Sequence, residues 1–170
     1  MLHRFVQNEK PIYIRIILEI YDQRLYDTKY KDYFVIWINK RNSQSFLALE
    51  IAAQRSNVEI INLIYSYYEK YNSVVKFQNK ETNIFHQISK KNEMYPLIFF
   101  YEKLQKHYPN ENILDFTNNT GMTPLHYAAK CNNKRVLDLL LDYGCNINQI
   151  DDDGYTALHY AVTICKYRNH

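Results

Sequence analysis

The 170-residue chain contains only three glycines and four prolines, and none of them is adjacent to another. Numbers this low exclude a flexible Gly-rich linker and a Pro-rich or low-complexity segment. Cysteine is also scarce, and the three that occur, Cys131, Cys145 and Cys165, lack the spacing of a zinc site. An odd number of cysteines without a signal peptide is typical of a reducing compartment. The sequence therefore predicts a folded protein in the cytoplasm.

Neither sign of charge dominates the chain, and no hydrophobic run is long. The 21 Lys and Arg residues and the 18 Asp and Glu residues are mixed, which gives a formal net charge of +3. Because there is no block of like charge, we predict no nucleic-acid partner. The most apolar runs, 12–20 and 33–38, are too short to span a bilayer, so we predict no membrane insertion by this segment.

One sequence motif occurs twice in the C-terminal part of the chain. Residues 121–129 read GMTPLHYAA and residues 154–162 read GYTALHYAV, which gives a period of 33 residues. Pro124 suits the first position of a helix, because its missing N–H would be unpaired there anyway. Leu125 and the two alanines that follow it share one helical face, and the small alanines allow a neighbouring helix to approach closely. The motif therefore predicts a helix with a buried face.

The residues after this motif complete a repeated unit. A second helix is expected from about Lys134 to Asp142, with Gly144 in a left-handed C-terminal cap. The polar stretch that ends in Asp153 and Gly154 predicts a tight projecting turn. A period of 33 with Thr-Pro-Leu-His at the start of a helix resembles the ankyrin repeat family. The resemblance implies an all-α solenoid of helix–turn–helix units with projecting β-hairpin-like loops.

Degenerate copies of the motif occur along the whole chain, with Leu2-His3, Leu49-Glu50 and Phe85-His86 at the Leu125-His126 positions. We therefore assign one ankyrin repeat domain to residues 1–170. It is divided into a partial repeat at about 1–18, an insertion at about 19–41, repeats at about 42–77, 78–117 and 118–150, and a partial repeat at 151–170.

Two features depart from a regular array. The insertion is rich in aromatic residues, so we expect an extended hairpin-like segment or a lengthened second helix that packs on the repeats. Both ends of the chain fall within a repeat, and no polar capping repeat is recognisable. We therefore expect the chain to be a segment of a longer protein.

No motif predicts chemistry. His3, His86, His126 and His159 recur at one position of the repeat, where stacked units would hold them too far apart to share a metal ion. In ankyrin repeats, which the chain resembles, this histidine bonds the backbone around the preceding turn and ties neighbouring repeats together. The stretch 151–154 resembles the start of a calcium loop but lacks the closing glutamate. Phosphate-loop, nucleophile-elbow and kinase motifs are missing too. We predict no enzymatic activity, metal or cofactor for this segment.

The resemblance implies that the function is recognition of another protein. Ankyrin repeats commonly hold partners on a concave face formed by the hairpin tips and the exposed ends of the first helices. Exposed Phe46, Met122 and Tyr155 beside charged residues would suit binding hot spots. The charge would run from basic to acidic along this face. The matching positions predict these partner-binding residues: Arg55, Lys80, Thr82, Lys90, Lys91, Asn119, Thr120, Met122, Lys130, Asp152, Asp153 and Tyr155.

We therefore predict a non-enzymatic, monomeric interaction module or scaffold that binds a protein partner on its concave face. The alternative is the N-terminal or internal ankyrin portion of a larger enzyme or membrane protein, such as a DHHC-type palmitoyltransferase, an ion channel or a kinase. In that case the cytoplasmic repeats would be tethered to a membrane through another part of the chain. The sequence does not identify the partner.

Overall fold

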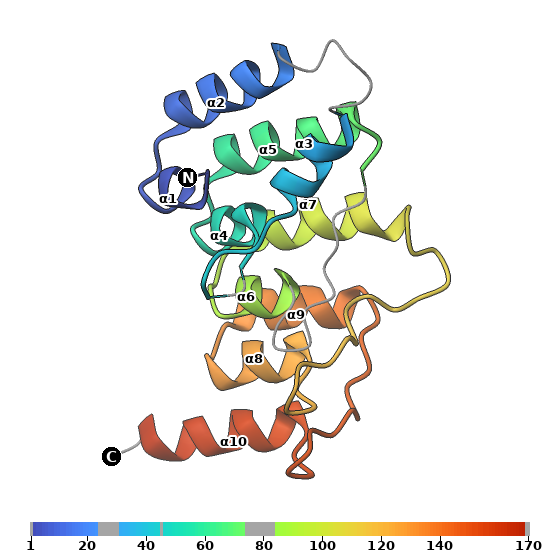
Figure 1. Cartoon of the computed structure of the whole chain (residues 1–170). Helices are drawn as coiled ribbons and strands as arrows, with labels where there is room; N and C mark the ends of the chain where they lie inside the picture. Colours follow the sequence, from blue (N-terminus) through green and yellow to red (C-terminus); the bar gives the residue numbers. More distant parts are fainter. Residues whose placement is uncertain (1, 24–30, 45, 74–83, 169–170) are drawn as a thin grey trace. The chain divides into compact units, whose positions relative to one another are not determined.

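The computed structural model describes residues 2–23, 31–44, 46–73 and 84–168, and the regular structure within these ranges is helical (Figure 1). The all-α architecture predicted from the sequence is therefore confirmed. The chain divides into two compact units, Met1–Phe77 and Gln78–His170. The first unit contains α1 (Leu2–Gln7), α2 (Pro11–Gln23), α3 (Lys31–Ile38), α4 (Ala48–Gln54) and α5 (Val58–Lys70). The second unit contains α6 (Ile84–Ser89), α7 (Met94–Gln105), α8 (Pro124–Lys130), α9 (Lys134–Asp142) and α10 (Ala157–Arg168).

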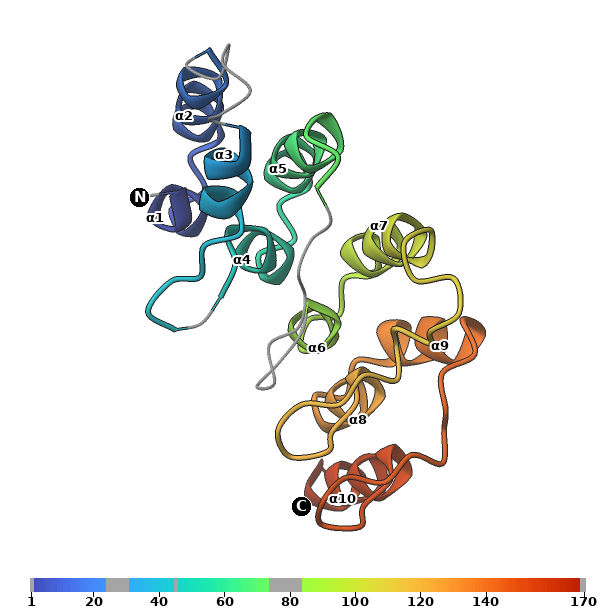
Figure 2. The ribbon, with the colours of Figure 1, turned by 45° about the vertical axis from the view of Figure 1, so that its right-hand side comes forward.

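Each unit is built from helix pairs in which a short helix packs against the longer helix that follows it. These pairs are α1 with α2, α4 with α5, α6 with α7, and α8 with α9. The first helices of successive pairs also stack on one another, α1 on α4 in the first unit and α6 on α8 in the second, where the 12-residue helix α10 packs on α8. The long helices form a second layer in each unit, α2 beside α5 and α7 beside α9 (Figures 1 and 2). This arrangement is the stacked helix–turn–helix repeat that the sequence predicts.

The helix α8 shows how the repeated motif works. Thr123 precedes the helix with extended backbone, and its N–H donates to Nδ1 of His126 at 3.0 Å. Pro124 occupies the first turn, where it leaves no donor unsatisfied. Leu125 is 2% exposed, and the two alanines of the motif are also buried. The predicted helix start and the predicted buried face are both confirmed.

The short turn between the paired helices uses asparagine side chains. Oδ1 of Asn57 accepts a hydrogen bond from the backbone N–H of Ile60 at 3.0 Å and so caps the first turn of α5. In the second unit, Nδ2 of the buried Asn133 donates to the carbonyl of Ser89 at 2.7 Å. This bond joins the start of α9 to the end of α6, so one asparagine ties two successive repeats together.

The segment expected as an insertion is helical at residues 19–23 and 31–38. α2 continues to Gln23, and residues 31–38 form the separate helix α3, so the hairpin-like alternative is wrong for these residues. Phe34 is 1% exposed and contacts the ring of Tyr71 in the turn after α5, with a centroid distance of 4.7 Å. The hydroxyl of Tyr68 donates to the carbonyl of Ile38 at 3.2 Å. Because Phe34 and Ile38 are four residues apart, a helix brings both onto the face that packs on α5.

Glu50 occupies the histidine position of the repeat in the first unit. Its Oε2 accepts hydrogen bonds from the backbone N–H of Leu47 at 2.8 Å and from Nη1 of Arg41 at 3.1 Å. Burial raises the pKa of Glu50, while these two donors oppose that rise. The carboxylate therefore repeats the capping role of the histidine and adds an ion pair to the turn before α4.

Candidate interaction surface

Projecting turns precede the short helices, and those of the described residues share one design. The first residue of each turn is an asparagine or an aspartate, namely Asn42, Asn118 or Asp151. Its Oδ1 accepts hydrogen bonds from the backbone N–H groups two and four residues later, at 2.8–3.1 Å. Its own N–H donates to the carbonyl four residues later, at 2.9–3.0 Å. In the turns 118–122 and 151–155, which are described throughout, these bonds hold the projecting backbone in one conformation.

In the second unit, a tyrosine of the following helix braces each turn. Nδ2 of Asn118 donates to the hydroxyl of Tyr127 at 3.2 Å, whereas the hydroxyl of Tyr160 donates to Oδ2 of Asp151 at 2.6 Å. Burial acts to raise the pKa of Asp151, but the Tyr160 hydroxyl and the two backbone donors outweigh it and hold the pKa below its usual value of 3.8. The hydrogen bond to Asp151 and burial raise the pKa of Tyr160 to about 12.

Replacing Asp151 with asparagine is expected to reduce the free energy of unfolding by about 1 kcal/mol at pH 7, because a charge-assisted hydrogen bond becomes a neutral one. The folded-state pKa of Asp151 is lowered, so its ionised form contributes stability above pH 3.8 that is lost as the pH falls through the folded-state pKa. Urea unfolding of both proteins at pH 7 and pH 3 measures this difference, which should shrink at pH 3.

Asn118 is the internal control for this substitution, because it already holds the same kind of turn as an asparagine. Asp151→Asn should therefore keep the turn geometry. A loss of stability that is equal at both pH values would show that the charge of Asp151 does not stabilise the turn.

The histidine of the repeat joins each short helix to the next projecting turn. Nε2 of His126 donates to the carbonyl of Tyr155 at 3.0 Å, and Nε2 of His86 donates to the carbonyl of Met122 at 2.8 Å. Because Nδ1 of His126 accepts from Thr123, its proton is on Nε2. Burial lowers the pKa of His86 to about 4, against the opposing effect of the Met122 carbonyl, so its ring is neutral at pH 7. Both histidines therefore act as structural donors between repeats.

Successive turns of the second unit also touch directly. The N–H of Asp152 donates to the carbonyl of Thr120 at 3.1 Å. Gly121 lies at this contact with a φ of +71°, and a β-carbon there would be 2.5 Å from Oδ1 of Asp152 and 2.7 Å from its backbone nitrogen. Only glycine fits this position without displacing the neighbouring turn.

These features define one surface of the second unit, which we name the turn face. It consists of the projecting turns 118–122 and 151–155 and the residues at the C-terminal ends of α6 and α8. Predicted binding residues exposed on this surface are Lys90, Lys91, Asn119, Thr120, Lys130, Asp152, Asp153 and Tyr155. Arg55 is exposed in the first unit, where it pairs with Glu9 at 3.3 Å. Lys80 and Thr82 lie outside the described residues.

The expected exposure of Met122 is wrong. Met122 is only 6% exposed, whereas Tyr155, at the same position of the next repeat, is 49% exposed. The carbonyls of both residues accept a hydrogen bond from the histidine of the preceding repeat, so the difference in exposure lies in the side chains and not in this bond. The side chain of Met122 is thus a packing residue, and Tyr155 remains as an exposed aromatic of the turn face.

The basic residues of the turn face have aromatic neighbours. Nζ of Lys90 lies 5.1 Å from the ring centre of Tyr127 and donates to Oε1 of Gln87 at 3.3 Å. Nζ of Lys130 lies 5.5 Å from the ring centre of Tyr160. These contacts hold two cations over the short helices. Burial lowers the pKa of Lys90, with an opposing effect of Cys131.

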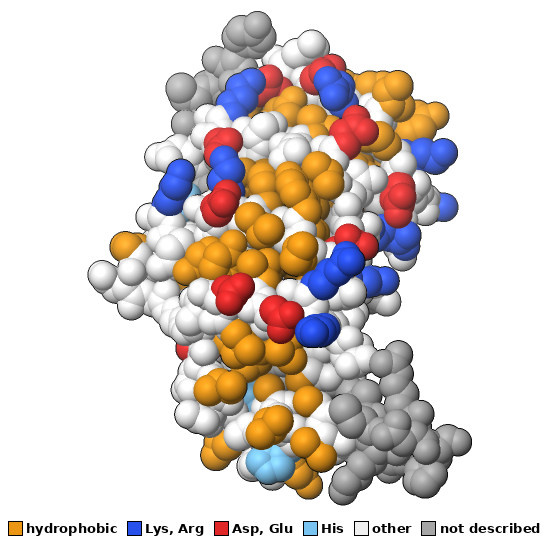
Figure 3. Space-filling model, turned by 180° about the vertical axis from the view of Figure 1, so that it is seen from behind, with side chains coloured by type: hydrophobic (Ala, Val, Ile, Leu, Met, Phe, Trp, Pro, Cys, Tyr) orange, Lys and Arg blue, Asp and Glu red, His pale blue; other side chains and the backbone are white. Residues whose placement is uncertain are grey.

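The helix α10 ends the described part of the second unit with apolar groups at its surface. Leu158 is 66% exposed and Val162 is 48% exposed. The space-filling view shows hydrophobic side chains around a histidine at this end (Figure 3). Among the described residues, no cluster of three or more His, Cys, Asp or Glu side chains could hold a metal ion. The described helices also include none long and apolar enough to cross a membrane.

The sequence analysis missed the side chains that hold the projecting turns. Asn42, Asn118 and Asp151 each lie seven residues before a leucine position of the repeat, at 49, 125 and 158. This recurrence is visible in the sequence and could have identified them. No local signal indicates the contact between Gly121 and Asp152, because it joins two different repeats.

Comparison with known proteins agrees with this architecture. A family model described as ankyrin repeats in three copies matches residues 78–167, which is 90 of the 170 residues. Two fowlpox virus proteins described as ankyrin repeat proteins are 43% identical over 49 residues and 51% identical over 45 residues. These matches cover 29% and 26% of this chain and 26% and 30% of the two viral proteins. A Dictyostelium discoideum protein described as a serine/threonine-protein kinase is 37% identical over 65 residues, which are 38% of this chain and 7% of that protein. The chain thus spans less than a third of the length of each of these relatives.

Proposed function

Because the chain belongs to the ankyrin repeat family, we propose that it is a non-enzymatic interaction module that binds a protein partner through the turn face. It acts as a monomer in the cytoplasm and needs no cofactor. Ankyrin repeats are generally protein–protein interaction modules, and the residues proposed to contact the partner are those that the turn face exposes. Binding of this kind uses a rigid surface and no reacting group.

The observation that supports this proposal most directly is the rigidity of an exposed, chemically mixed surface. Oδ1 of Asn118 and Oδ1 of Asp151 hold the two turns, and the histidines bond them to the short helices. A surface that is ordered before binding loses little conformational entropy when a partner arrives. Exposed Tyr155 lies beside Asp152 and Asp153, while Lys90, Lys91 and Lys130 follow the short helices, so the partner would present groups of opposite charge.

Reversing the charge of Lys90 and Lys91 tests the proposal. The double variant Lys90→Glu, Lys91→Glu is expected to weaken binding of the natural partner by about tenfold or more and to change its salt dependence. The partner is first captured from a lysate of the source organism with residues 1–170 as bait and identified by mass spectrometry. Its affinity is then measured with purified proteins at two salt concentrations.

The matched control is Lys134→Glu, Arg135→Glu, which makes the same change in net charge on two exposed residues of α9. This control should bind the partner within about twofold of the natural chain, since exposed charges away from a contact have small effects. Circular dichroism should show both variants folded. Equal affinity of the natural chain and the Lys90/Lys91 variant would remove these lysines from the binding surface.

A second candidate is that the repeats serve as the binding portion of a larger enzyme or membrane protein. The observation that favours it is the similarity to the D. discoideum protein described as a kinase, of which the matched segment is only 7%. The full-length transcript tests this candidate. A kinase signature, or an Asp-His-His-Cys stretch between apolar spans, would support it, and further repeats alone would contradict it.

A further inference from the structure

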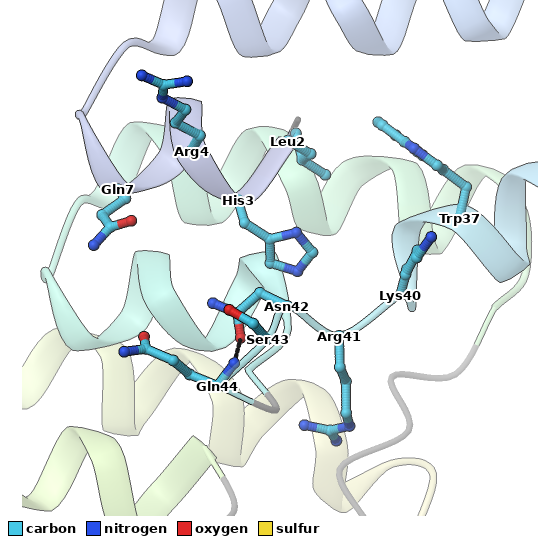
Figure 4. A pocket seen from close by; sticks show the side chains of 10 residues that line it. All are labelled: Leu2, His3, Arg4, Gln7, Trp37, Lys40, Arg41, Asn42, Ser43 and Gln44. Carbon is cyan, nitrogen blue, oxygen red and sulfur yellow. Dashed lines mark hydrogen bonds between the residues drawn. The ribbon is translucent and has the colours of Figure 1, made fainter.

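The first unit contains a pocket of about 650 Å³ between α1, the end of α3 and the projecting turn that begins at Asn42 (Figure 4). The ring of His3 reaches from α1 toward Asn42 and Ser43 at the centre, while Arg4 lies on one margin and Lys40 on the other (Figure 4). The pocket is thus formed by a short helix and a projecting turn, as the turn face is in the second unit. Its volume suits a few residues of a bound segment.

The charged side chains among the described residues that line this pocket are all basic. Arg4 and Lys40 are exposed, and Arg41 also lines the pocket. The charge of Arg41 is balanced by Glu50, whose Oε2 lies 3.1 Å from Nη1. No acidic side chain is among the described residues that line the pocket. Arg4 and Lys40 therefore give it a positive potential from two opposite margins.

The remaining lining is rich in hydrogen-bonding groups. Side-chain amides come from Gln7, Asn42 and Gln44, and the amide carbonyl of Asn42 already holds its own turn. Nε2 of His3 is buried without a hydrogen bond among the described residues. Burial lowers the pKa of His3, although the backbone carbonyls of Lys40 and Phe46 act in the opposite direction. Because the one N–H of the neutral ring faces these carbonyls, Nε2 can accept a hydrogen bond from an N–H of an incoming peptide.

We propose that this pocket binds an extended acidic segment of a protein partner, with carboxylates of the segment placed between Arg4 and Lys40. The amide groups and His3 supply hydrogen bonds to the peptide, and Trp37 supplies an apolar wall. This inference rests on the proposed function, since it assigns the chemistry of one segment of the partner. The charge complementarity between an acidic peptide and two margin cations carries it.

A peptide fits these observations better than a nucleic acid. Nucleic acids are bound through many phosphate contacts, and the described residues that line the pocket offer only two cations that are not balanced by Glu50. Single strands also require stacking platforms, and Trp37 is the one aromatic side chain among the described lining residues. An extended peptide needs few charges and uses the polar groups that line the pocket.

The test uses the full chain and a fluorescein-labelled acidic peptide of about twelve residues with alternating Glu and Ser, a length that exceeds the span of the pocket. Fluorescence polarisation at low salt measures its affinity. Arg4→Gln, Lys40→Gln should weaken binding by about five- to tenfold. The matched control Lys134→Gln, Arg135→Gln makes the same change in net charge on α9 and should bind within about twofold of the natural chain. An amide NMR spectrum should show peptide-dependent shifts at His3, Asn42 and Gln44.

Each contrary result overturns the inference. If the Arg4/Lys40 variant and the Lys134/Arg135 control weaken peptide binding equally, the peptide responds only to the net charge of the protein. If the peptide does not bind the natural chain, the pocket does not bind an acidic segment. An oligothymidylate that binds as tightly as the peptide, with the same dependence on Arg4 and Lys40, would assign the pocket to phosphates. If the peptide fails while the natural partner still requires Lys90 and Lys91, this inference fails and the proposed function stands. If binding of the natural partner is unchanged both by the Lys90/Lys91 variant and by the Arg4/Lys40 variant, the proposed function itself fails.

Discussion

Replacing Leu125 with alanine should lower the free energy of unfolding by about 2 to 5 kcal/mol, the range found for large-to-small changes in a well-packed core. The side chain of Leu125 is 2% exposed. It belongs to α8, which packs on α6, α9 and α10, so the cavity would lie among several elements that cannot all close around it. Urea unfolding followed by circular dichroism measures the change.

Leu158 provides a matched control, because it occupies the same position of the motif but is 66% exposed. Leu158→Ala should change the free energy of unfolding by less than about 0.5 kcal/mol, as surface substitutions usually do. The two variants delete the same atoms from equivalent helices, so their difference measures burial alone. Equal losses of stability would contradict the assignment of Leu125 to the core of the second unit.

Gly121→Ala is expected to be the second strongly destabilising change, with a loss of about 2 to 4 kcal/mol. The φ of +71° at Gly121 is costly for alanine by about 1–2 kcal/mol. The added β-carbon would also lie 2.7 Å from the backbone nitrogen of Asp152, which a side-chain rotation cannot relieve. Overpacking of this kind adds about 1–3 kcal/mol. Thermal unfolding and urea unfolding both report the change.

Gly154→Ala separates the two contributions to this loss. Gly154 has a φ of +80°, but a β-carbon there would meet no atom within 4 Å. This variant should therefore lose only about 1–2 kcal/mol, the part that comes from the left-handed backbone. If both alanine variants lose the same stability, the close approach of the turns 118–122 and 151–155 does not constrain the protein.

The consequence of Gly121→Ala for binding follows from the same contact. The turns that meet at Gly121 form the centre of the turn face, so the substitution separates groups proposed to contact one partner. Gly154→Ala leaves that contact unchanged. The pair therefore also distinguishes a loss of binding that comes from the spacing of the turns from one that comes from general destabilisation.

The sequence by itself determined the local units of this protein. The motif around Pro124 and Leu125 predicts the start and the buried face of α8, and Gly144 predicts the left-handed end of α9, where its φ is +78°. These features depend on residues a few positions apart, because helix capping, proline geometry and helical periodicity act over one or two turns. Because each of these signals spans only a few residues, degenerate copies of the motif, such as the one around Leu49, could also be recognised.

Only the tertiary structure decided which residues are buried among those that occupy the same position in different repeats. Met122 and Tyr155 share one position, as do Leu125 and Leu158, yet one of each pair is buried and the other is exposed. The pocket between Arg4 and Lys40 and the fold of residues 31–38 as α3 were likewise not predicted. The physical reason is that burial and electrostatic potential depend on residues of the neighbouring repeat. The hydrogen bonds from His86 to Met122, 36 positions apart, and from Asn133 to Ser89, 44 positions apart, illustrate this. A repeated motif specifies each unit, and the neighbours it meets after stacking decide what that unit exposes.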